Sequence, residues 1–313
     1  MFYKKISSVL ILCFFTIAAY GNNQFEIIAP APPGGANDLF ARYVSQALKS
    51  HNINAIPINR PGADGLIGLR AGKDNKDTRT LIVASAGLAL YAPLNPDRMI
   101  DIDLLKDFQP VTMLFTNYMA VVVSADSRYQ NLNDLVVDLK TNPDKRAWSS
   151  GSPVVYYGCL QFLDRIKGQS IAVPYAGAVK QLTALITKEV DFTCANEIDL
   201  QPFLQDKRVR ILTSASPSRL RGHDTIPTLN EQGIDLTVGS WAVLLAHKQA
   251  SDQYVSMVHK IVTETIVNDK TSSLLNGRGV TPWVTTPQQT KQFLEQQIAI
   301  TRPLVQKYHP KSK

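Results

Sequence analysis

The stretch APAPPGGANDLFAR, residues 29–42, joins a short apolar strand, Phe25–Ala29, to an amphipathic helix. Its Pro-Pro-Gly-Gly turn leaves the first N–H groups of the helix unpaired above the end of the strand. The helix dipole adds about half a positive charge there, and glycine, which has no Cβ, lets an anion approach the backbone. The stretch therefore predicts a strand–loop–helix unit with a main-chain site for a small carboxylate or phosphate. The alternative is a tight turn that holds no ligand.

Strand-like and helix-like runs alternate through the rest of the chain, a pattern typical of parallel βαβ units. The helices carry apolar residues at spacings of three and four, as in Leu132, Leu135 and Leu139. The strands are short and rich in Val, Ile and Leu, which suits strands covered on both faces. The predicted strands are Phe25–Ala29, Ala55–Ile58, Thr80–Ser85, Met119–Val123, Arg146–Ser149, Ile171–Pro174, Val190–Ala195, Val209–Thr213 and Val238–Leu245.

Residues 1–21 have the features of a secretory signal peptide. Lys4 and Lys5 precede an uncharged apolar run, Ile6–Ala19, and Ala19-Tyr20-Gly21 is a small-x-small cleavage signal. The alternative is a membrane anchor, but the run is shorter than the ~20 residues that a span needs and no basic stop-transfer cluster follows it. We therefore expect an exported protein whose mature chain begins near Asn22.

The composition is that of a two-lobed globular protein. About 290 residues remain after cleavage, more than one compact core usually holds. The formal charge of +7 includes Lys4 and Lys5, so the mature chain keeps about +5, which mildly favours anionic ligands or an anionic surface. Its basic residues are scattered, with no run interleaved with aromatic residues, so no nucleic-acid partner is expected. The histidines show no ligand spacing, so no metal and no other cofactor is expected.

Cys159 and Cys194 are the cysteines that remain after cleavage. In an exported protein they can form one disulfide. The alternative is that both act as small buried hydrophobic residues. Cys159 falls in a predicted helix and Cys194 in a predicted strand, which leaves both alternatives open.

A second glycine-containing segment, residues 59–68, follows the second predicted strand. Its glycines have the spacing G-x-x-G-x-x-G, which differs from the dinucleotide fingerprint G-x-G-x-x-G, and the chain has no P-loop. Nucleotide binding is therefore only weakly indicated.

Together the two loops resemble those of the extracytoplasmic solute-binding receptors of tripartite tricarboxylate transporters, the TctC or Bug family. Residues 30–42 match the family segment P-x-x-P-G-G-x-x-D-x-x-A-R, and residues 59–68 match N-R-P-G-A-G-G-x-I-G with Asp64 in place of a glycine. Further segments match in order, so the resemblance covers nearly the whole mature chain. They are residues 107–111, 173–177, 190–196, 226–228 and 240–246.

The resemblance implies an α/β, type II periplasmic-binding-protein fold, in which two βαβ lobes with parallel-rich sheets surround a ligand cleft and close by a hinge. We expect residues 22–122 and 216–313 to form lobe 1 and residues 123–215 to form lobe 2. The resemblance also implies a periplasmic receptor without enzymatic activity. It would capture a small organic acid and deliver it to the membrane subunits of a tripartite tricarboxylate-type transporter. We expect a monomer.

Ligands of open α/β sheets bind beyond the carboxyl ends of the strands, so four loops that follow strands are expected to line the cleft, two from each lobe. Main-chain N–H groups and serine hydroxyls in these loops are expected to donate to a carboxylate of the ligand. The expected ligand-binding residues are Pro33, Gly34, Gly35, Asn37, Asp38, Ser85, Ala86, Gly87, Ser149, Ser150, Gly151, Ser152, Tyr175, Gly177 and Asn196.

Some of these residues have alternative roles. Asp38 either contacts the ligand or only stabilises its own helix and loop. The serines of residues 149–152 either bind the ligand or form an exposed turn. Asn196 either donates to the ligand or satisfies backbone groups at the end of its strand.

Two loops depart from the family pattern. Pro153-Val154-Val155 follow the third loop, where the family has more hydroxyl groups, and Leu88-Ala89-Leu90 follow Gly87. These apolar residues favour a bulkier and less polar carboxylate than citrate, such as an aromatic or branched acid.

Two other functions are open. A secreted hydrolase is disfavoured, because G-x-S-x-G is absent and no histidine stands in a motif that indicates a base. A receptor that docks on a membrane sensor kinase needs the same two-lobed cleft, so the sequence does not separate it from a transport receptor.

Overall fold

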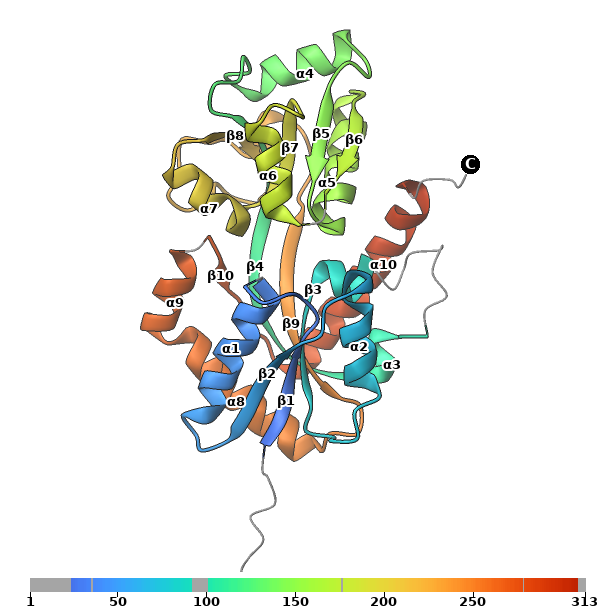
Figure 1. Ribbon diagram of the computed structural model, residues 1–313, viewed down its shortest axis with the longest axis vertical. Coiled ribbons are helices and arrows are strands. Elements are labelled where there is room, and N and C mark those ends of the chain that lie inside the picture. Colours follow the sequence, from blue (N-terminus) through green and yellow to red (C-terminus); the bar gives the residue numbers. More distant parts are fainter. Residues whose placement is uncertain (1–23, 35, 92–100, 176, 278, 309–313) are drawn as a thin grey trace, which may run out of the picture.

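A computed structural model describes residues 24–34, 36–91, 101–175, 177–277 and 279–308. The predicted signal peptide and Gly35 lie outside these ranges. Two α/β lobes lie one above the other, and the long strand β4 (Phe108–Ser124) together with β9 (Gly239–His247) connects them (Figure 1). The predicted α/β fold with two lobes is therefore confirmed.

The sheet of lobe 1 has three parallel strands on one side, β1 (Gln24–Ala29), β2 (Asn54–Asn59) and β3 (Leu81–Ser85), with β2 at the edge. The strand order is β2-β1-β3-β9-β4, and both β9 and β4 pair antiparallel. The short strand β10 (Thr281–Pro282) pairs with β4. Antiparallel pairing allows β4 and β9 to pass between the lobes without a helical crossover.

Lobe 2 repeats the arrangement with parallel strands β7 (Phe192–Asn196), β5 (Ala147–Ser150) and β6 (Ile171–Pro174). The upper part of β4 joins them through β7, and β8 (Val209–Ser214) also pairs with β4. All nine predicted strands are confirmed. The strand predicted at Met119–Val123 is the second half of β4, which begins 11 residues earlier, at Phe108.

The helices cover both faces of the sheets (Figure 1). In lobe 1 they are α1 (Ala36–Lys49), α2 (Leu66–Lys73), α3 (Leu104–Asp107), α8 (Asp252–Val267), α9 (Asp269–Asn276) and α10 (Pro287–Tyr308), with one helical turn, η2, at Gly87–Tyr91. In lobe 2 they are α4 (Leu132–Thr141), α5 (Pro153–Ile166), α6 (Ala178–Ile186) and α7 (Glu197–Gln205). Two one-turn 3₁₀ helices, η1 (Ala63–Gly65) and η3 (Asn230–Gln232), complete the elements.

The predicted apolar stripes form the core. In α1, Phe40, Val44 and Leu48 are at most 1% exposed and pack in one cluster with Phe115 of β4 and Val258 of α8. Burial of each large apolar side chain contributes about 1.5–3 kcal/mol. A second cluster lies on the other face of the sheets and extends through both lobes, so the lobes share packed core as well as strands.

The exact lobe boundaries stay a prediction. The hydrogen-bonding pattern favours placing residues 216–238 in lobe 2, where the sequence interpretation placed them in lobe 1. The Ala215 N–H donates to the Met119 carbonyl at 2.7 Å, and the Val238 N–H donates to the Ala215 carbonyl at 2.9 Å. Leu220 also belongs to the buried cluster of lobe 2.

A disulfide joins Cys159 of α5 to Cys194 of β7, with the Cα atoms 5.8 Å apart. Both residues are fully buried, so the bond lies inside lobe 2 and ties α5 to the sheet. The structure therefore contains the disulfide, the first of the two alternatives for the cysteines.

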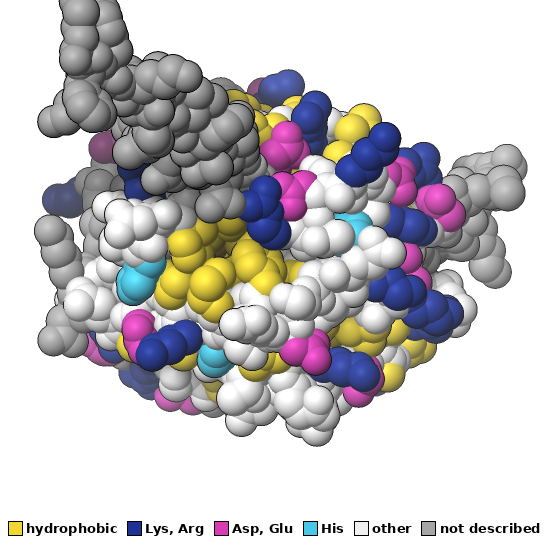
Figure 2. Space-filling view, turned by 90° about the horizontal axis from the view of Figure 1, so that it is seen from below, with side chains coloured by type: hydrophobic (Ala, Val, Ile, Leu, Met, Phe, Trp, Pro, Cys, Tyr) yellow, Lys and Arg dark blue, Asp and Glu magenta, His cyan; other side chains and the backbone are white. Residues whose placement is uncertain are grey.

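None of the helices in the described ranges is long and apolar enough to cross a membrane. Seen from the far end of lobe 1, Lys and Arg side chains alternate with Asp and Glu around a central hydrophobic area (Figure 2). The described side chains of this face therefore form a mixed surface rather than a patch of one sign.

Candidate functional site

A cavity of about 900 Å³ lies between the lobes. Lobe 1 contributes the loop after β1, the start of α1 and the end of α9, and lobe 2 contributes the start of α6 and one side of α7. Two of the four predicted loops therefore meet here. The lining residues are Pro32, Pro33, Gly34, Ala36, Leu39, Gly177, Ala178, Val179, Lys180, Ile198, Asp199, Gln201, Pro202, Gln205 and Gly277.

The loop after β1 is held by Asp38. Its carboxylate accepts hydrogen bonds of 3.0 Å from the Gly34 N–H, from Arg42 Nε and from Asn59 Nδ2. Burial raises the pKa of Asp38, but the bonds from Arg42, Gly34 and Asn59 outweigh it, and the pKa lies below its ordinary value. Asp38 thus orients the loop. The Gly34 N–H was expected to face a ligand, but it is engaged by the protein's own side chain.

The segment of residues 59–68 supports this loop from behind. Asn59 Nδ2 also donates to the Ala31 carbonyl at 3.0 Å. A Cβ at Gly68 would lie 2.8 Å from both Pro30 Cα and the Arg60 carbonyl oxygen, so only glycine lets α2 pack this closely. The second glycine-containing segment therefore positions the first.

In lobe 2, Ser149 lies inside the protein. Its hydroxyl donates to Thr193 Oγ1 at 2.9 Å, and Gln181 Nε2 donates to the same Thr193 oxygen at 2.6 Å. Ser149 is fully buried, so its side chain connects β5, β7 and α6 rather than facing the cavity. Tyr175 is also engaged within lobe 2, because its hydroxyl donates to Glu189 Oε2 at 3.1 Å.

Gly151 brings the starts of two helices together. A Cβ there would lie 2.7 Å from the Gly177 carbonyl carbon and 2.8 Å from the Ala178 nitrogen. The loop before α5 therefore lies directly against the first turn of α6. The predicted residues Ser150 to Ser152 and Gly177 are thus brought together.

The helices α5, α6 and α7 all begin at this edge of the lobe 2 sheet. Their N-cap residues, Ser152, Gly177 and Asn196, form no side-chain capping bond to their helices. Elsewhere in the chain, Asn131 caps α4 with a capping box and Ser251 caps α8. An uncapped helix start leaves its first N–H groups without intrahelical acceptors and presents the positive end of the dipole. Three such starts follow neighbouring parallel strands, and those of α5 and α6, which have no acid in their first turn, form an electropositive edge.

Three predicted residues carry buried side-chain oxygens that lack a hydrogen-bond partner among the described residues, namely Asn37 Oδ1, Ser152 Oγ and Asn196 Oδ1. Asn37 adjoins the cavity-lining Ala36, and Ser152 and Asn196 stand at the open helix starts. An unsatisfied buried polar atom costs about 1–3 kcal/mol. Such atoms are expected to find their partners in a ligand or in water.

The other two predicted loops meet beside the cavity. A Cβ at Gly87 would lie 3.6 Å from Pro153 Cδ, so the loop of Ser85, Ala86 and Gly87 faces the start of α5. Near it, Tyr91 of η2 stacks on Tyr157 of α5 with ring centroids 5.1 Å apart. Burial raises the pKa of Tyr91 to about 12. The lobes are therefore in contact on this side.

Two acids at the start of α7, Glu197 and Asp199, were not among the predicted residues. Asp199 lines the cavity and accepts a 3.4 Å hydrogen bond from Asn196 Nδ2. Burial raises the pKa of Asp199 to about 6, although the Asn196 bond lowers it, and burial raises the pKa of Glu197 to about 7. Acids in a first helical turn normally indicate an exposed helix start. The two acids closely follow Asn196, a predicted site residue, and this position is the signal in the sequence that could have identified them.

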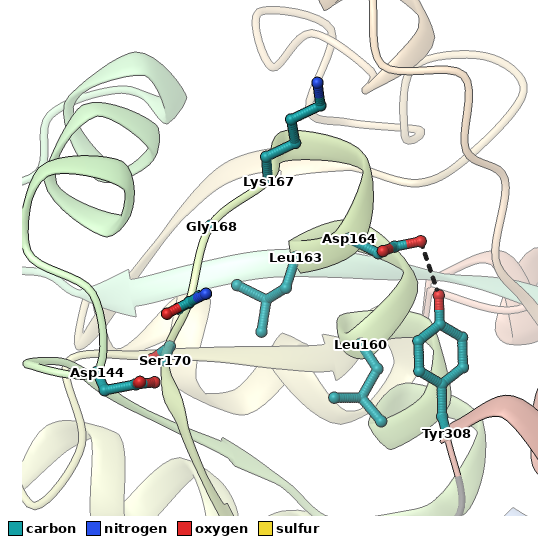
Figure 3. Close-up of a pocket in the computed structure, with 9 residues that line it drawn as sticks. Asp144, Leu160, Leu163, Asp164, Lys167, Gly168, Ser170 and Tyr308 are labelled. Atoms are coloured by element: carbon teal, nitrogen blue, oxygen red, sulfur yellow. Dashed lines mark hydrogen bonds between the residues drawn. The ribbon is translucent and has the colours of Figure 1, made fainter.

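A second cavity, of about 510 Å³, lies at the opposite end of α5 (Figure 3). There Tyr308 donates to Asp164 Oδ2 at 3.0 Å, and Lys307 Nζ lies 2.8 Å from the same oxygen. This cavity adjoins Lys167, the C-cap of α5, where the helix dipole is negative. It is therefore a poorer site for an anion than the cavity between the lobes.

Comparisons with known proteins agree on one family. The family model described as "Tripartite tricarboxylate transporter family receptor" matches residues 41–309. Protein BugT of Bordetella pertussis is 25% identical over 284 residues, which are 89% of this chain and 87% of BugT.

Solved structures show the same fold. "R. palustris Rpa4515 with adipate" is 22% identical, with a TM-score of 0.84 over 92% of this chain and 97% of that one. "MatC (Rpa3494) from Rhodopseudomonas palustris with bound malate" is also 22% identical, with a TM-score of 0.77 over 90% of this chain and 98% of that one.

Proposed function

Since the chain belongs to the tripartite tricarboxylate transporter receptor family, we propose that it is a periplasmic receptor that captures a small carboxylic acid between its lobes. It then delivers the acid to the membrane subunits of a tripartite tricarboxylate-type transporter. Two structural neighbours, Rpa4515 with adipate and MatC with bound malate, support a carboxylate ligand.

The observation that carries this proposal is the pair of open helix starts of α5 and α6, of which the α6 start lines the cavity. A carboxylate placed there accepts N–H bonds that the protein itself leaves unmade. A hydrogen bond to a charged group contributes about 1.5–3 kcal/mol, so two or three of them hold a small acid. The loop of residues 32–34, held by Asp38, closes over the acid from lobe 1.

A receptor also accounts for the serine-rich loop without catalysis. The Ser149 hydroxyl is committed to Thr193. Ser152 Oγ has no hydrogen-bond partner among the described residues, so no described histidine activates it. A nucleophile needs an adjacent base within hydrogen-bond reach. The described residues of this loop therefore favour ligand binding over hydrolysis.

Isothermal titration calorimetry on the mature chain tests the proposal. The panel contains adipate, malate, citrate, benzoate, hexanoate and 6-aminohexanoate, with adipamide as the uncharged control. We expect at least one acid to bind with a Kd below about 100 µM and adipamide not to bind. Adipamide binding as tightly as every acid, or no acid binding, contradicts the proposal. Uptake by vesicles that contain the membrane subunits, with and without the receptor, tests delivery.

A further inference from the structure

We propose that the captured acid also carries an ammonium group, which Asp199 receives while the open start of α6 holds the carboxylate. The ligand class is therefore an amino-substituted carboxylic acid with an apolar body. This inference rests on the proposed receptor function and specifies its ligand.

The first argument is an excess of acceptors over donors at one end of the cavity. The Asp199 carboxylate lines the cavity, and within the described ranges its one hydrogen bond comes from Asn196 Nδ2 at 3.4 Å. The Asn196 Oδ1 atom of the same amide is buried and has no donor in the part of the chain that the structure describes. Glu197, beside it, is 7% exposed and forms no hydrogen bond or ion pair with the described residues. The Asn196 amide oxygen can only accept a hydrogen bond, and the carboxylates of Asp199 and Glu197 also only accept unless they are protonated. An ammonium group brings three donors and no acceptor.

The second argument is the distribution of charge along the cavity. Lys180 stands in the first turn of α6, so the positive charge and the open N–H groups lie on the α6 side. Within the described part of the chain, neither Lys180 nor any other cation forms an ion pair with Asp199. Asp199 and Glu197 lie on the α7 side. A ligand with opposite charges at its two ends matches both sides, whereas a dicarboxylate sets its second carboxylate against Asp199.

The third argument is the chemistry of the remaining walls. The cavity is also lined by the apolar residues Pro33, Leu39, Val179, Ile198 and Pro202. Apolar walls bury a methylene or aromatic body and offer it no hydrogen bonds. The expectation from sequence of a less polar ligand than citrate fits such a body.

The number of protons released when the ligand binds depends on the acidic side chains of the site alone. An ammonium group beside Asp199 lowers the pKa of that carboxyl from about 6, because an opposite charge favours the ionised form. Binding near pH 6 therefore releases part of a proton per site. Titrations in buffers of different ionisation enthalpy measure this number, and a ligand without an ammonium group releases none.

The test compares three acids with the same six-carbon chain, 6-aminohexanoate, hexanoate and adipate, together with 4-aminobutanoate and leucine, which place the two charges closer together. At pH 7.5 we expect at least one amino acid of this set to bind more than about tenfold more tightly than hexanoate or adipate. Asp199→Asn keeps the shape and removes the charge. We expect it to weaken that amino acid by about 10- to 100-fold and to leave hexanoate within about threefold.

Asp206→Asn is the matched control, because Asp206 is an exposed acid at the end of α7, outside the cavity lining. We expect it to change no affinity. Asp199→Glu, which restores the charge, is expected to keep the preference for the amino acid. If Asp199→Asn unfolds the chain, the proton release of the parent protein decides.

The outcomes separate the two proposals. Hexanoate or adipate binding as tightly as every amino acid, or Asp199→Asn leaving amino-acid binding unchanged, overturns the ammonium site and leaves a carboxylate receptor. Failure of every acid to bind overturns the receptor itself.

Discussion

Ala178, the first residue of α6, is the position at which the anion site can be tested by one substitution. It lines the cavity, is partly exposed and follows the uncapped Gly177. Ala178→Asp places a permanent carboxylate where the proposed ligand carboxylate sits. Ala178→Asn introduces a side chain of nearly the same size without the charge.

The size of the effect follows from the distance between the two carboxylates. At roughly 5 Å and an effective dielectric constant of about 20, two like charges repel by about 3 kcal/mol. That corresponds to roughly 100-fold in affinity. The same carboxylate favours the positive end of α6, so the ligand-free Ala178→Asp protein is expected to melt about 1–3 °C higher than the parent.

The assay is calorimetry of parent, Ala178→Asp and Ala178→Asn with the acid that binds the parent most tightly, combined with thermal melts of all three proteins without ligand. We expect the Asn variant to stay within about fivefold of the parent in affinity. Equal affinities of the Asp and Asn variants would refute the argument, because charge at the start of α6 would then not matter. A lower melting temperature of the Asp variant would show that this helix start is not electropositive.

Three further outcomes are expected from the described contacts. Replacing Cys159 and Cys194 by Ser lowers the free energy of unfolding by about 4 kcal/mol, because the disulfide closes a loop of 35 residues. Urea unfolding of the oxidised parent and of the variant measures this difference, and equal midpoints would contradict the prediction. Glu197 has its pKa raised from 4.5 to about 7 by burial, so the folded state binds more protons than the unfolded state between these values. The free energy of unfolding therefore falls by at most about 3 kcal/mol as the pH rises from about 4.5 to 7. Thermal melts at several pH values are expected to show a smaller pH dependence of stability for Glu197→Gln. An unchanged pH dependence would show that Glu197 does not titrate in this range. Asp38→Ala removes the acceptor of the Gly34 N–H and is expected to lower the free energy of unfolding by about 1–3 kcal/mol. Ligand binding is expected to weaken as well, because the loop loses its position. A variant that binds ligand and melts like the parent would show that Asp38 does not hold the site.

The apolar patterns along the chain were enough to place every predicted strand, because periodicity and β-branched content are local properties. The first half of β4 was missed for a physical reason. Its residues are buried on both faces, its register shifts near Pro110 and Met113, and Pro110 interrupts the run. Such a strand shows neither alternation nor an uninterrupted β-branched stretch.

The candidate site was predicted in part. The loop of Pro33 and Gly34 and the turn at Gly177 were identified from their glycines, and both line the cavity. Ser149 was placed in the site because it follows a strand, but its hydroxyl points into the network with Thr193. Which side of a strand end faces the cleft depends on the neighbouring strands, and a single segment does not contain that information.

The sequence by itself determined the order of strands and helices, the two glycine-containing loops and the family, since all of these depend on residues close together in the chain. Only the tertiary structure decided that three uncapped helix starts share one edge of a sheet and that the buried Glu197 and the partly exposed, cavity-lining Asp199 have no cation partner among the described residues. Burial and convergence arise from contacts between distant segments. The same acidic residue is ordinary on a solvated helix and a binding group in a closed cleft, because its surroundings set the free energy of its charge.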